Sequence, residues 1–158
     1  MKYIVSILVL LICFSSNAQQ TGSLAVYGKI KYKKTILNEV RIEVYKDNEL
    51  QQEIVNLRNG SFKLNLKIGS VYSVAFVKDN YIKKSVAVVA KADSSITISG
   101  KYFFQLDIEL YKEEDDEVDE TMLPPVAKLY IKNQSTGFTY DKKYVKWVAE
   151  KYKEENEQ

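Results

Sequence analysis

The feature that most constrains the fold is a strict alternation of apolar and polar residues over short stretches of the chain. Apolar side chains recur at every second position over residues 40–44, 62–68, 72–76 and 104–110. A period of two sends alternate side chains to opposite faces of a β-strand, so one face is buried and the other meets water. The pattern predicts seven half-buried antiparallel strands, at 24–33, 40–46, 50–58, 61–68, 71–78, 81–91 and 102–112, with a further short strand at 95–99 as an option.

Pairs of residues that tolerate a positive φ angle separate several of these strands: Asp47-Asn48, Asn59-Gly60 and Asp79-Asn80. Such pairs form the two-residue turns of β-hairpins. We therefore expect a hairpin at each pair, including one at Asn59-Gly60 that joins the strands at 50–58 and 61–68. Short strands with turns at this spacing favour an all-β, two-sheet sandwich, and a small closed barrel is the alternative.

The first eighteen residues have the features of an export signal. A basic Lys2 precedes an apolar run over residues 4–14, and small residues occupy the −3 and −1 positions of a cleavage site after Ala18. The run is shorter than the roughly 20 apolar residues of a membrane-spanning helix. We predict a signal peptide at 1–18 and an exported product, periplasmic or associated with the cell surface of a Gram-negative bacterium. An uncleaved membrane anchor is the alternative.

Charge and proline divide the rest of the chain. Residues 19–112 are predicted to be the sandwich domain. Residues 113–120 hold seven acids in eight positions, and two consecutive prolines follow shortly after. Such a block repels itself and stays solvated, so residues 113–126 are predicted to be a linker. A calcium site in the acidic block is the alternative, although the spacing of a calcium-binding loop is missing.

Residues 127–158 are predicted to be a tail with a strand and an amphipathic helix. The strand covers 127–133, and a turn follows at 134–137. Asp141 is a suitable N-cap for a helix. The residues that share one helical face are Tyr144, Val145, Val148, Ala149 and Tyr152, with Trp147 at its edge.

Composition excludes several kinds of chemistry. The chain has no His, so it lacks the commonest general base and metal ligand. Its single cysteine, Cys13, lies within the predicted signal peptide, and Ile12 before it does not fit a lipid-attachment site. With 23 Lys and Arg against 21 Asp and Glu, the net charge of +2 gives little attraction to nucleic acid. We predict a protein that is not an enzyme and has no catalytic residue, no metal site, no cofactor and no nucleic-acid partner.

Four short segments resemble the carboxypeptidase regulatory-like domain of exported bacterial proteins. They are Gly28-x-Ile30, the run from Leu37 to Val44, Asn59-Gly60-Ser61-Phe62-x-Leu64, and Gly69-x-x-Tyr72. The resemblance covers roughly residues 24–91. It implies a transthyretin-like β-sandwich of about seven strands and an accessory or binding role.

Aromatic side chains are the candidate contacts with a partner. Of twelve tyrosines, three are predicted to point away from the core: Tyr27, Tyr45 and Tyr111. They either contact a ligand or cover the surface in the ordinary way. On the tail helix, Tyr144, Trp147 and Val148 either meet a partner or pack on the chain's own sandwich.

The leading functional hypothesis is protein–protein interaction in a bacterial envelope or surface assembly. Its partner would be an envelope or outer-membrane protein. The alternative is a carbohydrate-binding module that holds a polysaccharide with its exposed tyrosines. No later segment is long and apolar enough to be transmembrane, so we predict no membrane span after signal cleavage.

Overall fold

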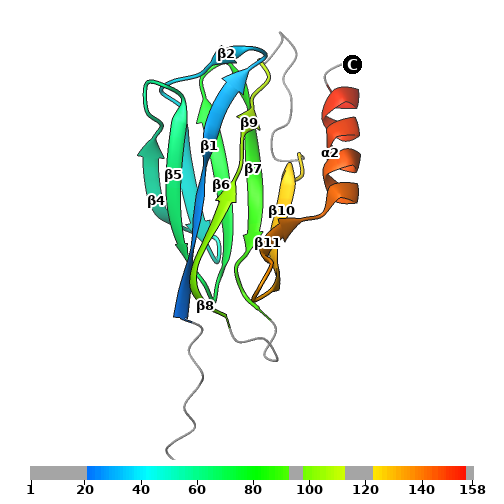
Figure 1. Cartoon of the computed structure of the whole chain (residues 1–158). Coiled ribbons are helices and arrows are strands. Elements are labelled where there is room, and N and C mark those ends of the chain that lie inside the picture. Colours follow the sequence, from blue (N-terminus) through cyan, green and yellow to red (C-terminus); the bar gives the residue numbers. More distant parts are fainter. Residues whose placement is uncertain (1–20, 93–97, 113–122, 156–158) are drawn as a thin grey trace, which may run out of the picture.

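The computed structural model describes residues 21–92, 98–112 and 123–155, which form two β-sheets packed face to face and one helix (Figure 1). The first sheet is built around the long strand β1 (Thr21–Tyr32). Its other strands are β2 (Thr35–Ile36), β5 (Ser61–Lys67), β8 (Ser99–Gln105) and β9 (Ile108–Glu109). The predicted all-β two-sheet sandwich is confirmed.

The second sheet has six strands in the order β11-β10-β7-β6-β3-β4. Their bounds are β3 (Arg41–Lys46), β4 (Glu49–Val55), β6 (Val71–Lys78), β7 (Tyr81–Val89), β10 (Ala127–Asn133) and β11 (Gly137–Tyr140). The helix α2 (Lys142–Glu155) follows β11 directly. Three earlier predictions fall wholly or mainly outside the described residues: the signal peptide at 1–18, the acidic block at 113–120 and the optional strand at 95–99.

Three of the strand pairs are parallel, although all pairs were predicted to be antiparallel. β8 and β9 run parallel to β1, and β10 runs parallel to β7. Alternation specifies which face of a strand is buried, and it carries no information about the direction of the neighbouring strand.

The predicted hairpin at Asn59-Gly60 is wrong. β4 pairs with β3 in the second sheet, whereas β5 pairs with β1 in the first. Gly60 has a φ of 75° and its N–H donates to the Leu57 carbonyl at 2.8 Å, so the turn is tight but passes from one sheet to the other. The hairpins at the other two pairs are confirmed by the β3–β4 and β6–β7 registers.

The hydrophobic core fills the space between the sheets. Inward residues of β1, β5 and β6 meet there, and the rings of Phe62 and Phe76 contact edge to face with centroids 5.3 Å apart. The largest fully buried side chains include Leu24, Ile30, Ile42, Leu64, Phe76 and Leu129. Leu129 belongs to β10, so the tail contributes to the main core.

The helix packs on the chain's own sandwich. Val148 and Tyr152 form a small second core with Ile82 of β7. Asp141 accepts hydrogen bonds from the N–H groups of Lys143 and Tyr144 at 2.9 and 3.1 Å, which confirms it as the N-cap. Within the described ranges no helix is long and apolar enough to cross a membrane.

Candidate binding groove

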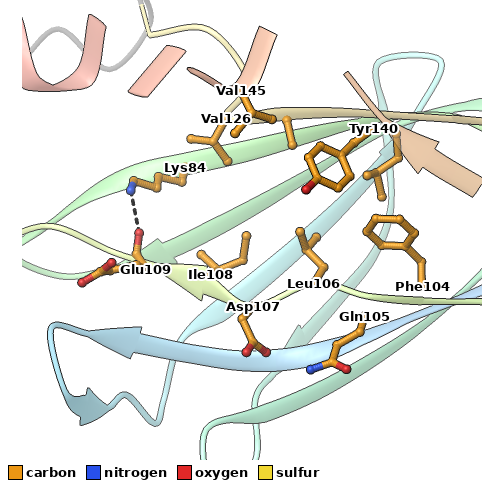
Figure 2. A pocket seen from close by; sticks show the side chains of 12 residues that line it. Lys84, Phe104, Gln105, Leu106, Asp107, Ile108, Glu109, Val126, Tyr140 and Val145 are labelled. Carbon is orange, nitrogen blue, oxygen red and sulfur yellow. Dashed lines mark hydrogen bonds between the residues drawn. The ribbon is translucent and has the colours of Figure 1, made fainter. Parts of the chain in front are cut away.

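The two sheets separate along one edge of the sandwich and leave a groove of about 360 Å³ (Figure 2). β8, β9 and the two residues between them border it on the first sheet. On the opposite side it is bordered by β10 and β11 of the second sheet and by the first turn of α2. Its size lies at the low end of the range for ligand pockets, which suits a few side chains better than a large cofactor.

The wall on the first sheet is apolar because the alternation of β8 continues into β9. Phe104, Leu106 and Ile108 point into the groove, whereas Gln105 and Asp107 point away from it (Figure 2). Asp107 instead accepts a hydrogen bond from the N–H of Lys29 at 2.9 Å. The negative charge of this segment therefore lies outside the groove.

The opposite wall comes from the tail. Val126 and Val145 lie above the groove in Figure 2, and the ring of Tyr140 projects into it. The ring of Tyr140 also contacts Phe104 edge to face, with centroids 6.3 Å apart. Val126 is fixed by its N–H, which donates to the Ser85 carbonyl at 2.7 Å. The groove thus exists because the tail packs against the edge of the sandwich.

A buried lysine lies at one end of the groove. Lys84 of β7 is 6% exposed, and its ammonium group donates to the Glu109 carbonyl oxygen at 2.6 Å (Figure 2). The same nitrogen lies 3.7 Å from the ring centroid of Tyr111 and 5.3 Å from that of Tyr152. Within the described residues it forms no salt bridge, so its direct contacts are a carbonyl oxygen and two ring faces.

Burial changes the acid–base chemistry at this end. It lowers the pKa of Lys84 from 10.5 to about 8, and the nearby Glu109 carboxylate opposes part of that effect. Burial, with a smaller contribution from Glu109, also raises the pKa of Tyr111. Lys84 can bind an anion when it is protonated, and its neutral form is a base and a nucleophile.

The lowered pKa predicts a pH dependence of stability. Below pH 8 both folded and unfolded chains carry the proton on Lys84, and the folded state bears the full cost of burying the charge. Between pH 8 and 10.5 only the unfolded chain keeps this proton, so the free energy of unfolding should rise with pH by up to about 3 kcal/mol. Lys84→Met should lack this rise, whereas tyrosine titration is common to both proteins.

Urea unfolding of wild type and Lys84→Met at several pH values between 7 and 10.5 checks this prediction. The difference in unfolding free energy between the two proteins should shrink or change sign as the pH rises. Parallel pH profiles would show that Lys84 is not buried as a charge.

Lys84 was not among the site residues predicted from the sequence, although the sequence contains a signal for it. Along β7 the inward positions are Ile82, Lys84, Val86 and Val88, and all four are buried. Three are aliphatic and the fourth is a lysine at a core position, which is rare unless the charge has a role. Extending the alternation through 81–91 would have placed this lysine inside the sandwich.

The predicted contact residues on the helix have different environments. Trp147 is 48% exposed and its ring lies 5.8 Å from that of Tyr144, whose hydroxyl donates to the Pro125 carbonyl at 2.8 Å. Val148 is 1% exposed and packs against Ile82. We therefore leave Val148 out of the candidate surface, because a helix packed on its own sandwich buries this face.

The three predicted sheet tyrosines do not gather. Tyr27 is exposed on the outer face of the first sheet. Tyr45 lies on β3 of the second sheet and donates to Glu43 at 2.8 Å, a hydrogen bond that raises the pKa of Tyr45. Tyr111 stands over Lys84 at the end of the groove. Only Tyr111 is therefore part of the groove region.

No protein-family model and no curated protein sequence matches the chain. Solved structures with similar folds include wild-type catechol 1,2-dioxygenase from Acinetobacter radioresistens, at 13% identity and a TM-score of 0.45 over 67% of this chain and 58% of the dioxygenase. A DUF3823 family protein from Parabacteroides merdae is 18% identical, with a TM-score of 0.36 over 58% of this chain and 48% of that protein. A Bacteroides uniformis protein with a proposed carbohydrate-binding role is 16% identical, with a TM-score of 0.37 over 56% of this chain and 41% of that protein.

This chain spans less than two thirds of the length of each of these proteins, and at such identities the likeness extends to the β-sandwich fold alone. The prediction that the chain is not an enzyme is nevertheless corrected, because the matched structures include dioxygenases and a sandwich fold therefore does not exclude catalysis. That prediction relied on the absence of His and of a cysteine in the mature chain, and it overlooked the amine of Lys84. We therefore withdraw the exclusion of an enzyme.

Within the described parts of the chain, no group of three or more His, Cys, Asp or Glu is placed to hold a metal ion.

Proposed function

We propose that this chain is an exported β-sandwich module that binds a protein of a bacterial envelope or surface assembly. The groove between the sheet edges is its proposed binding site. The observation that carries the proposal is an open, largely apolar groove bordered by an edge strand. An edge strand and an adjacent apolar groove together suit an extended peptide segment, whose alternate side chains fill the groove.

The lining of the groove favours a protein over a polysaccharide as its occupant. The side chains that project into the space are mostly aliphatic or aromatic, with the amine of Lys84 at one end. A sugar bound there would lose hydrogen bonds to water and find few in return, which is costly. Apolar side chains of a peptide would instead gain from burial, at roughly 25 cal/mol per Å².

Export and location are part of the same proposal. They rest on the basic start, the apolar run and the small residues before position 19. The membership of the carboxypeptidase regulatory-like family also remains a proposal, supported by the sequence resemblance and by a sandwich fold. Tyr144 and Trp147 are proposed as additional contacts, because they lie on the helix that supplies Val145 to the groove.

Leu106→Glu tests the proposed function. A carboxylate in the apolar wall should reduce capture of the partner from envelope fractions by about tenfold or more, since burying an unpaired charge is costly. Gln105→Glu is the matched control, because it adds the same charge one residue away on the face that points away from the groove. Thermal unfolding of both variants checks that each is folded. Equal capture by the two variants would place the binding site elsewhere.

Carbohydrate binding is a second candidate function, favoured by the outer face of the first sheet. Phe103 is 66% exposed there and Tyr27 is 40% exposed. The register places Lys63 opposite Tyr27 on one side and Gln105 beside it on the other. Rings flanked by amine and amide groups suit a polysaccharide, with basic side chains favouring an anionic one.

Gel retardation in dextran sulfate tests this second candidate, with neutral dextran as the comparison. Phe103→Ala should reduce retardation about tenfold if the ring stacks on the polymer, whereas Tyr45→Ala on the other sheet should not. Equal retardation of both variants would reject this face as a site.

A further inference from the structure

We propose that the Lys84 end of the groove binds the terminal carboxylate of the partner, so that the segment in the groove is an apolar C-terminus. This inference rests on the proposed function, because it names the part of the partner that occupies the groove. Three features support it: a buried cation that forms no salt bridge with any described residue, apolar walls and a closed end.

The cation is built into the site. Lys84 is only 6% exposed, and its ammonium group has three N–H donors. One donates to the Glu109 carbonyl, and two ring faces lie nearby. Burying a charge without a counter-ion is costly, and a bound carboxylate would supply both the opposite charge and an acceptor for the remaining donors.

Among the described residues, no carboxylate forms a salt bridge with Lys84, so an anion can bind beside its ammonium group. Glu109 offers its backbone oxygen, and in Figure 2 its carboxylate points away from the groove. Asp107 also points away and is bonded to β1. In the described part of the chain, Tyr111 and Tyr152 also face the amine, and both present ring faces to it.

The closed end selects a chain terminus over an internal segment. Residues 108–112 cross from one sheet to the other: Ile108 pairs with Ile30 of β1, and the Tyr111 carbonyl accepts from the Ile82 N–H of β7 at 2.9 Å. Tyr81 and Lys112 form a further bridge between the same segments. An extended peptide that lies along β8 toward Lys84 therefore meets backbone there and has no path onward.

Two peptide libraries test the inference directly. Both consist of N-acetylated apolar pentapeptides of the same sequences, one with free C-terminal carboxylates and the other with C-terminal amides. Binding to the full-length mature protein is followed by NMR, with signals of the Lys84 side chain and of Leu106 as local reporters. The carboxylates should bind about ten- to hundredfold more tightly than the amides, as expected for a charge-assisted hydrogen bond.

Two variants and a pH series sharpen the test. Lys84→Met should reduce the affinity for carboxylate peptides to that for amides, whereas Lys83→Met, on the opposite face of β7, should leave the preference intact. The preference should also decline above pH 8, because the amine then loses its proton in the free protein. Thermal unfolding of Lys84→Met confirms that the variant is folded.

The outcomes separate this inference from the proposed function. Equal binding of acids and amides at the Leu106 reporter overturns the role of Lys84 and leaves the groove as a peptide site. Binding of neither library, while Leu106→Glu still abolishes capture of the partner, also overturns the C-terminal assignment. Decanoate, a fatty acid with a carboxylate and an apolar chain, is tested in parallel. If decanoate binds and no peptide does, the occupant of the groove is a fatty acid and the C-terminal assignment is overturned.

Discussion

Gly28→Ala is expected to unfold the protein or to lower its free energy of unfolding by more than about 4 kcal/mol, the range of the most damaging single substitutions. A Cβ atom at Gly28 would lie 1.8 Å from the carbonyl oxygen of Leu106 and 2.5 Å from its carbonyl carbon. Both are backbone atoms of the segment between β8 and β9, and that segment is fixed to β1 because the Leu106 N–H donates to the Tyr27 carbonyl at 2.8 Å. The clash is therefore relieved only by moving a wall of the groove away from the sheet.

Gly69→Ala is the matched control for this prediction. Gly69 has a φ of 108°, which strains an alanine, but a Cβ there meets nothing within 4 Å. Its cost should be limited to backbone strain, about 1–3 kcal/mol. Urea unfolding measures both variants. Similar losses at the two positions would show that β1 and the β8–β9 segment are not in such close contact.

Leu129→Ala is expected to destabilise the whole sandwich by about 2–5 kcal/mol, because it opens a cavity in the core. Leu129 is fully buried and belongs to the same cluster as Leu24 and Phe76, although the sequence analysis placed it in a tail beyond a linker. If the tail were a separate appendage, the loss of stability would be confined to the tail and the sandwich would unfold as in the wild type. A single unfolding transition that shifts as a whole is therefore the expected result.

Tyr130→Ala controls for effects of the strand itself. Tyr130 is the next residue of β10, and its side chain is 40% exposed on the other face. Its replacement should change the unfolding free energy by no more than about 0.5–1 kcal/mol, as for most surface positions. An unfolding profile of Leu129→Ala that matches that of Tyr130→Ala would contradict the placement of β10 in the core.

Period-two alternation predicted most of the fold, because it reports which side chains are buried. The strand at 71–78 agrees in its bounds with β6, and those at 40–46 and 61–68 differ from β3 and β5 by one residue. The direction and identity of the neighbouring strand depend on long-range packing. This is why the Asn59-Gly60 turn was correctly recognised as a turn but wrongly assigned to a hairpin.

The candidate site was less predictable, because it is formed by segments far apart in the chain. Phe104 and Tyr140 are 36 positions apart, and neither was singled out from the sequence. Lys84 was detectable in principle as a charged residue at a core position of an alternating strand. The groove itself could not be predicted, because the sequence does not reveal that the tail packs against the edge formed by β8 and β9.

Site-specific photo-crosslinking in living cells tests the central claim, that the groove holds an envelope partner. Tyr140 is replaced by p-benzoylphenylalanine, since its ring projects into the groove and is 40% exposed. Tyr45 on β3, which β7 and β6 separate from β10, is the control position. The account predicts one discrete covalent adduct with an envelope protein from position 140 and none from position 45. An adduct from position 45 alone, or the same adducts from both positions, would contradict it.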